Sequence, residues 1–131
     1  WNWLYFKPGI IMPDQQKSAE WNRGRYLVEG AGHCGACHTP KNMFGADRRD
    51  QALGGNLVQG ILAPRLDADP NSGLKSWSVE DIATYLQNGR NGKSHAGELM
   101  AKVAVNSPPK TSDADARAIA VYLKDLPAVA P

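Results

Sequence analysis

The stretch GHCGACHTP at residues 32–40 constrains this chain more than any other feature. It contains Cys34 and Cys37, the only two cysteines among 131 residues, and His38 follows directly after the second. Two thiols and an imidazole within five positions are too concentrated to be ordinary surface residues. The chain around them is therefore expected to fold about a disulfide, a metal ion or a cofactor.

Three interpretations of this cluster compete. A redox-active Cys-x-x-Cys pair usually opens a helix that lies between strands, and no such strand pattern is present. A structural zinc ion needs four tetrahedral ligands, yet apart from His33 and His38 beside the cysteines, the only other histidine is His95. Cys-x-x-Cys-His is the attachment signature of c-type haem, in which both thiols bond to vinyl groups and the histidine binds iron. One covalently bound haem uses every residue of the cluster, and we favour it over the other two.

A haem would also supply the core that a chain of this size needs. The length suffices for one hydrophobic core and not for two, so a single domain is expected. Residues 39–75 are rich in glycine, proline, asparagine and aspartate, and so long an irregular segment is uncommon inside a small domain. An apolar macrocycle would give these loops and a few helices a centre to pack on.

Three helices are predicted from apolar spacing and from terminal signals. Each follows a serine that can cap its first turn, and the second and third end at a glycine and before a proline. The first covers about residues 19–31 after Ser18, the second lies between Ser78 and Gly89, and the last lies between Ser112 and Pro127. No strand pattern of comparable strength appears, so we expect an all-α fold with long loops.

The charge and hydropathy of the chain exclude two classes of partner. Fifteen basic residues are interleaved with thirteen acidic ones, which leaves a formal net charge of +2 and no basic surface for a nucleic acid. No apolar run approaches the roughly twenty residues that cross a bilayer. Membrane association is therefore expected only through a larger complex.

The second axial ligand would decide whether a haem iron here carries electrons or binds another molecule. His33 and Met43 are too close to His38 along the chain, since five residues extend at most roughly 17 Å and must pass round the ring. Met12 would reach the iron only if the N-terminal arm folded over the haem. None of the three is favoured.

His95 and Met100 remain, and both are placed in the predicted loop between the second and last helices. Met100 has apolar neighbours in LMAKV, whereas His95 follows the polar run GRNGKS, so Met100 is favoured and His95 is the alternative. The competing interpretations are a methionine that fills the core and a histidine on the surface. A thioether opposite an imidazole raises the reduction potential and leaves no open site for a substrate.

Five motifs that occur in order resemble a class I cytochrome c domain over residues 18–127: GRYLVEGAGHCGACHTP, LGGNLVQG, SWSVEDIATYLQNGR, LMAKV and AIAVYLKDLP. The resemblance implies three main helices and long loops around one haem, with the first and last helices crossing near Gly24 and Tyr122. Residues 1–17 are then an aromatic, proline-containing linker arm, and residues 128–131 are a C-terminal tail.

The same resemblance implies further contacts with the haem. Trp77 would lie beside a propionate, and the backbone near Gly55 and Asn56 would accept the Nδ1 proton of His38, a bond that orients a ligand and tunes its metal. Arg65 and Arg90 are candidates to pair with propionates, although a solvated surface arginine is the favoured interpretation of each.

The resemblance is closer still to the haem domains of multihaem cytochrome subunits that serve membrane-bound bacterial dehydrogenases for alcohols, gluconate and related sugars or polyols. In those subunits an aromatic linker similar to WNWLYFKPG leads into the last of three haem domains. The chain also begins at Trp1 and not at a methionine, so we expect a C-terminal domain excised from a longer subunit.

That resemblance implies a function of electron transfer and not of catalysis. Electrons from a dehydrogenase subunit would pass through upstream haem domains to a quinone or another acceptor, at the periplasmic face of the bacterial inner membrane. One alternative is a mobile periplasmic carrier that acts alone. A haem enzyme or gas sensor, in which Met100 is absent from the iron or displaced, is the other.

Overall fold

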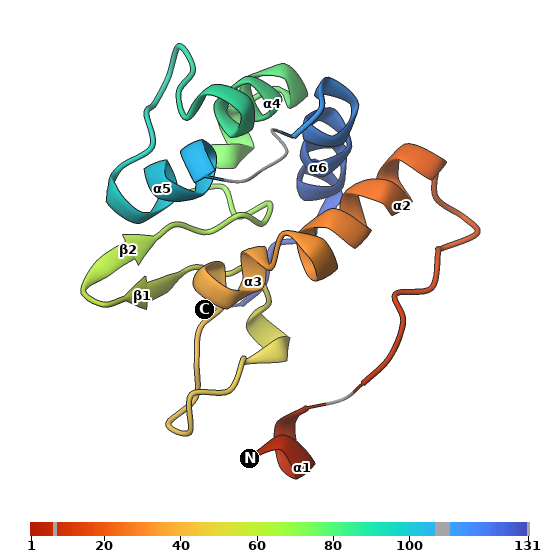
Figure 1. Cartoon of the computed structure of the whole chain (residues 1–131), viewed down its shortest axis with the longest axis vertical. Helices are drawn as coiled ribbons and strands as arrows, with labels where there is room; N and C mark the ends of the chain where they lie inside the picture. Colours follow the sequence, from red (N-terminus) through yellow and green to blue (C-terminus); the bar gives the residue numbers. More distant parts are fainter. Residues whose placement is uncertain (7, 107–110, 131) are drawn as a thin grey trace.

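The computed structural model describes residues 1–6, 8–106 and 111–130. Residue 7 of the predicted arm, residues 107–110 of the predicted domain and residue 131 of the predicted tail lie outside these ranges. Within them the fold is mostly helical, with one small hairpin (Figure 1). The α-helices are α1 (Asn2–Tyr5), α2 (Ala19–Tyr26), α3 (Cys34–His38), α4 (Val79–Asn88), α5 (Glu98–Asn106) and α6 (Asp113–Asp125). A π-helical turn covers Leu27–Ala31, 3-10 turns cover Arg49–Gln51 and Gly73–Ser76, and the strands are β1 (Asn56–Val58) and β2 (Ile61–Ala63).

The serine caps predicted from the sequence are present at three helices. The Ser18 side chain accepts a hydrogen bond from the backbone of α2, and the Ser112 side chain does the same for α6. Ser78 and Asp81 form a reciprocal capping box at the start of α4, and Gly89 ends that helix in the left-handed conformation. These caps satisfy backbone donors that would otherwise lack partners, so the predicted helix starts are confirmed.

The core forms where α6 packs against both α2 and α4 (Figure 1). Its buried members come from three helical segments and one loop: Val28, Leu53, Ile82, Ala120, Tyr122 and Leu123. Gly24 is buried where α2 crosses α6, and the exposed edge of the crossing carries a bidentate ion pair between Arg23 and Asp115. The crossing of first and last helices near Gly24 and Tyr122 is thus present.

Two elements correct the sequence-based expectations. Met100 lies on the helix α5 and not in a loop, because Glu98–Asn106 is made largely of good helix formers although no serine cap precedes it. The segment expected to be loop contains the antiparallel pair β1–β2, with Asn56 opposite Ala63. Gln59 and Gly60 join the strands with φ of 52° and 83°, which is the positive-φ pair of a type I′ hairpin turn.

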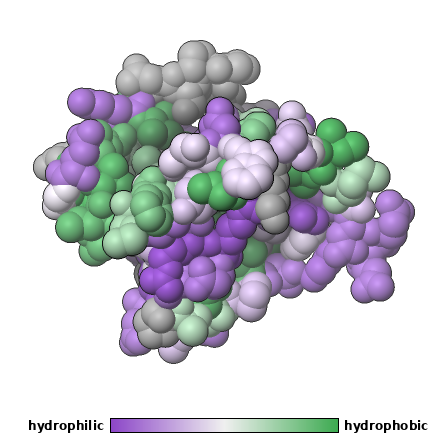
Figure 2. All heavy atoms as spheres, turned by 90° about the horizontal axis from the view of Figure 1, so that it is seen from below, coloured by the Kyte–Doolittle hydropathy of each residue, from purple (hydrophilic) through white to green (hydrophobic). Residues whose placement is uncertain are grey.

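The surface is apolar in patches. Figure 2 shows one face on which hydrophobic residues gather in several places with hydrophilic residues between them. Leu57 and Leu62 lie opposite each other in the hairpin, and both are exposed. In the described ranges no helix is long and apolar enough to span a membrane.

Candidate haem site

A change of helix type leads the chain into the cysteine motif. The π-helical turn Leu27–Ala31 continues α2, and Gly32 follows so close to the preceding turn that a Cβ atom there would lie 2.6 Å from the Leu27 carbonyl oxygen. His33 then adopts the left-handed conformation with φ of 51°. This sharp reversal begins α3 (Cys34–His38) as a separate helical turn.

The helical turn places the three predicted attachment residues on one face. Cys34 and Cys37 are three residues apart and His38 is four residues from Cys34, which are the spacings that align side chains along a helix. Neither cysteine is in a disulfide; Cys34 is half-buried and Cys37 is exposed. Both thiols thus lie on the same helical turn as the imidazole.

The environment of Cys34 does not suit a redox-active pair. Burial raises the pKa of this thiol, and the neighbouring Cys37 adds to the effect. A reactive dithiol needs the opposite, a thiolate stabilised by a lowered pKa. The zinc-site interpretation is not supported either. In the described part of the chain, no three His, Cys, Asp or Glu side chains are arranged to hold a metal ion.

The ring of His38 is oriented by a backbone carbonyl. Its Nδ1 atom lies 2.7 Å from the carbonyl oxygen of Pro64, which follows β2. Burial lowers the pKa of His38, and this outweighs the opposite effect of the Pro64 bond. A neutral ring that donates from Nδ1 leaves the lone pair of Nε2 available to a metal.

This contact corrects one prediction. The acceptor was expected near Gly55 and Asn56, but it is Pro64. Gly55 contacts His38 differently: its backbone N–H donates to the His38 carbonyl oxygen at 2.8 Å. Pro64 was missed because 26 residues separate it from His38, and a proline before Arg65 was the only signal in the sequence.

The five candidates for the second axial position differ in burial. Met12, His33 and His95 are exposed, and Met43 is 88% exposed. Met100 alone among the five is half-buried. In the view of Figure 1, the β1–β2 hairpin lies between α5, which carries Met100, and α3.

Trp77 and Arg65, two of the residues considered as neighbours of a haem propionate, both have partners within the protein. Trp77 is half-buried against the core and meets the ring of Tyr85 edge-on, with centroids 5.3 Å apart. Arg65 is not a solvated surface arginine, because it forms a bidentate pair with the buried Asp67. Asp67 carried no signal in the sequence.

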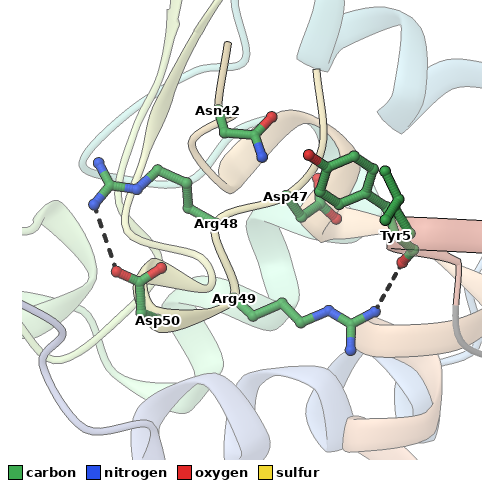
Figure 3. Close-up of a pocket in the computed structure, with 7 residues that line it drawn as sticks. Tyr5, Asn42, Asp47, Arg48, Arg49 and Asp50 are labelled. Atoms are coloured by element: carbon green, nitrogen blue, oxygen red, sulfur yellow. Dashed lines mark hydrogen bonds and ion pairs between the residues drawn. The ribbon is translucent and has the colours of Figure 1, made fainter. Parts of the chain in front are cut away.

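A separate hollow of about 390 Å³ lies between the N-terminal arm and the loop at residues 42–50. Figure 3 shows Arg49 reaching the backbone oxygen of Tyr5, while Arg48 pairs with Asp50. The arm is held there by a second contact, a hydrogen bond from Trp1 to the carbonyl oxygen of Phe44. This hollow contains none of the predicted haem residues.

No protein-family model matches the chain, but curated relatives do. It is 39% identical over 124 residues to the fructose dehydrogenase cytochrome subunit of Gluconobacter japonicus, across 95% of the chain and 25% of the relative. It is 41% identical over 131 residues to the cytochrome c subunit of the quinone alcohol dehydrogenase of Gluconacetobacter polyoxogenes, across 95% and 28%. The chain is homologous to the cytochrome c subunits of dehydrogenases.

The homology to cytochrome c subunits confirms the resemblance that the five motifs indicated. A third relative, the gluconate 2-dehydrogenase cytochrome c subunit of Pantoea cypripedii, is 39% identical over 131 residues, across 92% of the chain and 30% of that protein. The chain thus spans less than a third of the length of each of these three relatives.

Proposed function

We propose that this chain transfers single electrons through one covalently bound c-type haem. Cys34 and Cys37 would form the two thioether links, and His38 would bind the iron. The observation that carries the proposal is the α3 turn, where these side chains share one face while Pro64 occupies Nδ1 of the imidazole. The homology to dehydrogenase cytochrome c subunits supports it.

Met100 is proposed as the second axial ligand. Its support is its partial burial, which the four other candidates lack. A bound haem would supply a reversible one-electron couple of the iron. The two cysteines would fix the position of the ring, His38 and Met100 would fill both axial positions, and the apolar neighbours of Met100 would exclude water.

The setting of the proposed function is a dehydrogenase complex. We infer that the chain is a domain of a longer cytochrome subunit, that it receives electrons from a dehydrogenase and upstream haem domains, and that a quinone or another acceptor takes them. Its place would be the bacterial periplasm, on the face of the inner membrane. Support comes from the relatives, which are named as cytochrome subunits of fructose, gluconate and quinone-dependent alcohol dehydrogenases.

Replacement of Met100 tests the ligand set. The ferric wild type should show a sulfur-to-iron charge-transfer band and resist carbon monoxide in the ferrous form, because both axial positions are filled. Met100→Ala should lose the band and bind carbon monoxide rapidly. Met43→Ala is the matched control, since it removes an exposed methionine. A band that persists in Met100→Ala would refute this ligand, and rapid binding by the wild type would favour a haem enzyme or gas sensor.

A further inference from the structure

A buried ion pair holds the last described residues of the chain. Arg65 donates from Nε and Nη2 to the two carboxylate oxygens of Asp67, at 3.0 and 2.6 Å. The same Nη2 donates to the Val129 carbonyl oxygen at 2.6 Å, and the Val129 N–H donates to Asp67 at 2.8 Å. Asp67 is only 2% exposed, while Arg65 and Val129 are half-buried. We name this closed set of three residues the C-terminal clamp.

The C-terminal clamp packs against the glycine pair that precedes β1. A Cβ atom on Gly54 would lie 2.9 Å from a methyl carbon of Val129, and one on Gly55 would lie 3.1 Å from Cγ of Arg65. Leu53 is joined to the same layer, because its carbonyl oxygen accepts from the Leu66 backbone N–H at 2.9 Å. Residues 53–55 therefore have little room to move.

Two hydrogen bonds join His38 to residues of this layer. Pro64, whose carbonyl oxygen accepts from Nδ1 of His38, is bonded directly to Arg65 of the clamp. Gly55, whose N–H donates to the His38 carbonyl oxygen, contacts the Arg65 side chain. The clamp thus holds the ring and the backbone of His38 through two separate neighbours.

We propose that Arg65, Asp67 and Val129 form a positioning device that holds the Pro64 carbonyl on His38 and thereby sets the strength of this residue as a haem ligand. The inference rests on the function proposed above. An acceptor on Nδ1–H raises the basicity of a ligating histidine, and a more basic ligand favours ferric iron. A loosened clamp therefore shifts the reduction potential upward.

The charge state of the clamp supports this role. Burial alone would raise the pKa of Asp67. The hydrogen bonds from Arg65 and from the Val129 N–H together lower this pKa by more than burial raises it, so the net shift is downward. A carboxylate that stays ionised keeps both of its donors in place at neutral pH. The bidentate geometry restricts the arginine more than a single contact would.

Two substitutions open the clamp in different ways. Asp67→Asn removes the charge that holds Arg65. Val129→Pro removes the N–H that reaches Asp67, together with the valine side chain that packs on Gly54. Asp69→Asn is the control for the first, because it also deletes a carboxylate close to Arg65, at 3.6 Å, outside the bidentate pair. Val129→Ala is the control for the second, because it keeps the backbone N–H.

The measurements are made on the whole chain with haem attached. Relative to their controls, Asp67→Asn and Val129→Pro should raise the reduction potential. They should also speed solvent exchange of the His38 Nδ1 proton by about tenfold, the net worth of one hydrogen bond. If the clamp merely stabilises the fold, the two substitutions would lower the unfolding temperature and leave the reduction potential and the exchange rate unchanged. That result in the two variants would overturn the inference.

Failure of the proposed function gives a different result. If the wild type carries no haem, exchange of the Gly55 backbone N–H in the haem-free chain still reports on the clamp, because this proton bonds the His38 carbonyl oxygen. Faster exchange in Val129→Pro than in Val129→Ala supports the positioning of His38. Equal exchange in the two variants contradicts it.

Discussion

Gly24 of α2 lies directly against the backbone of Ala118 in α6. A Cβ atom on Gly24 would stand 2.0 Å from the Ala118 carbonyl oxygen and 2.8 Å from Cβ of Tyr122. Real non-bonded carbon atoms do not approach so closely, so the two helices can meet at this distance only through a glycine. The segment before the cysteine motif is thus fixed to the last helix of the described chain.

The first prediction concerns this crossing. Gly24→Ala should lower the free energy of unfolding by about 3 kcal/mol, because backbone atoms cannot move aside as a flexible side chain can. Gly92→Ala is the control, since no atom lies within 4 Å of a Cβ there, and its effect should stay within about 0.5 kcal/mol. Urea denaturation measures both, and equal effects would contradict the packing described here.

Local signals in the sequence sufficed for the parts of the fold that depend on neighbouring residues. Ser18, Ser78 and Ser112 predicted three helix starts because a cap acts within one turn. The helix α5 lacks such a serine, and strands of three residues are too short to show a period. The helix formers of α5 and the turn at Gln59 and Gly60 are weaker local signals than a serine cap, so reasoning from caps and periodicity missed these elements.

The candidate haem site also has a part that local sequence predicts and a part that it does not. The motif Cys34–His38 is contiguous, so its helical turn follows from its sequence. The partners of His38 are brought to it by the fold from residues 55 and 64, and no local rule distinguishes Pro64 from the other prolines. For the same reason Asp67, in an unremarkable acidic loop, gave no sign that it would be buried.

A second prediction concerns Tyr122 in α6, whose hydroxyl donates to a carboxylate oxygen of Glu29 beside the motif. Tyr122→Phe removes this hydrogen bond and keeps the ring that packs edge-on against Trp21, so the loss should be about 1 kcal/mol. Tyr26→Phe, at an exposed position, is the control. A Tyr122→Phe variant as stable as the wild type in urea would show that the bond contributes nothing.

The same tyrosine predicts a response to alkali. Burial, and next the bond with Glu29, raise the pKa of Tyr122 above its ordinary value. Because the folded pKa exceeds the unfolded one, its contribution to stability is complete below the unfolded pKa of about 10 and is lost as the pH rises through the folded pKa. The stability difference from Tyr122→Phe should therefore be constant between pH 7 and 9 and shrink at higher pH. Urea titrations of both proteins across this pH range measure the difference, and a difference that already shrinks between pH 7 and 9 would contradict the raised pKa of Tyr122.

Acid should act on the C-terminal clamp. The folded pKa of Asp67 lies below its unfolded value, so its stabilisation is present above the unfolded pKa and is lost as the pH falls through the folded one. Asp67→Asn should cost about 3 kcal/mol at pH 7, as expected for a broken buried pair, and less at pH 3. Arg65 and Asp69 are the charged groups that face this carboxylate. A cost that is independent of pH would contradict an ionised Asp67.

The N-terminal arm gives a prediction about domain limits. Removal of residues 1–10 should change the free energy of unfolding by about 0.5 kcal/mol or less, because the arm's contacts with the loop at residues 42–50 are exposed. Removal of residues 1–17 should cost about 1 kcal/mol more, since Asp14 bonds Asn22 and Lys17 pairs with Asp125. Equal stability of the two shortened chains would exclude a structural role for residues 11–17.

The intact mass of the chain, produced in a host that attaches haem, tests the central claim most directly. Cys34 and Cys37 on one helical turn with His38 predict a mass increased by one haem, with a visible spectrum that survives denaturation and extraction. Replacement of both cysteines by serine should abolish the added mass. A colourless wild-type protein with the mass of the bare polypeptide would contradict the account.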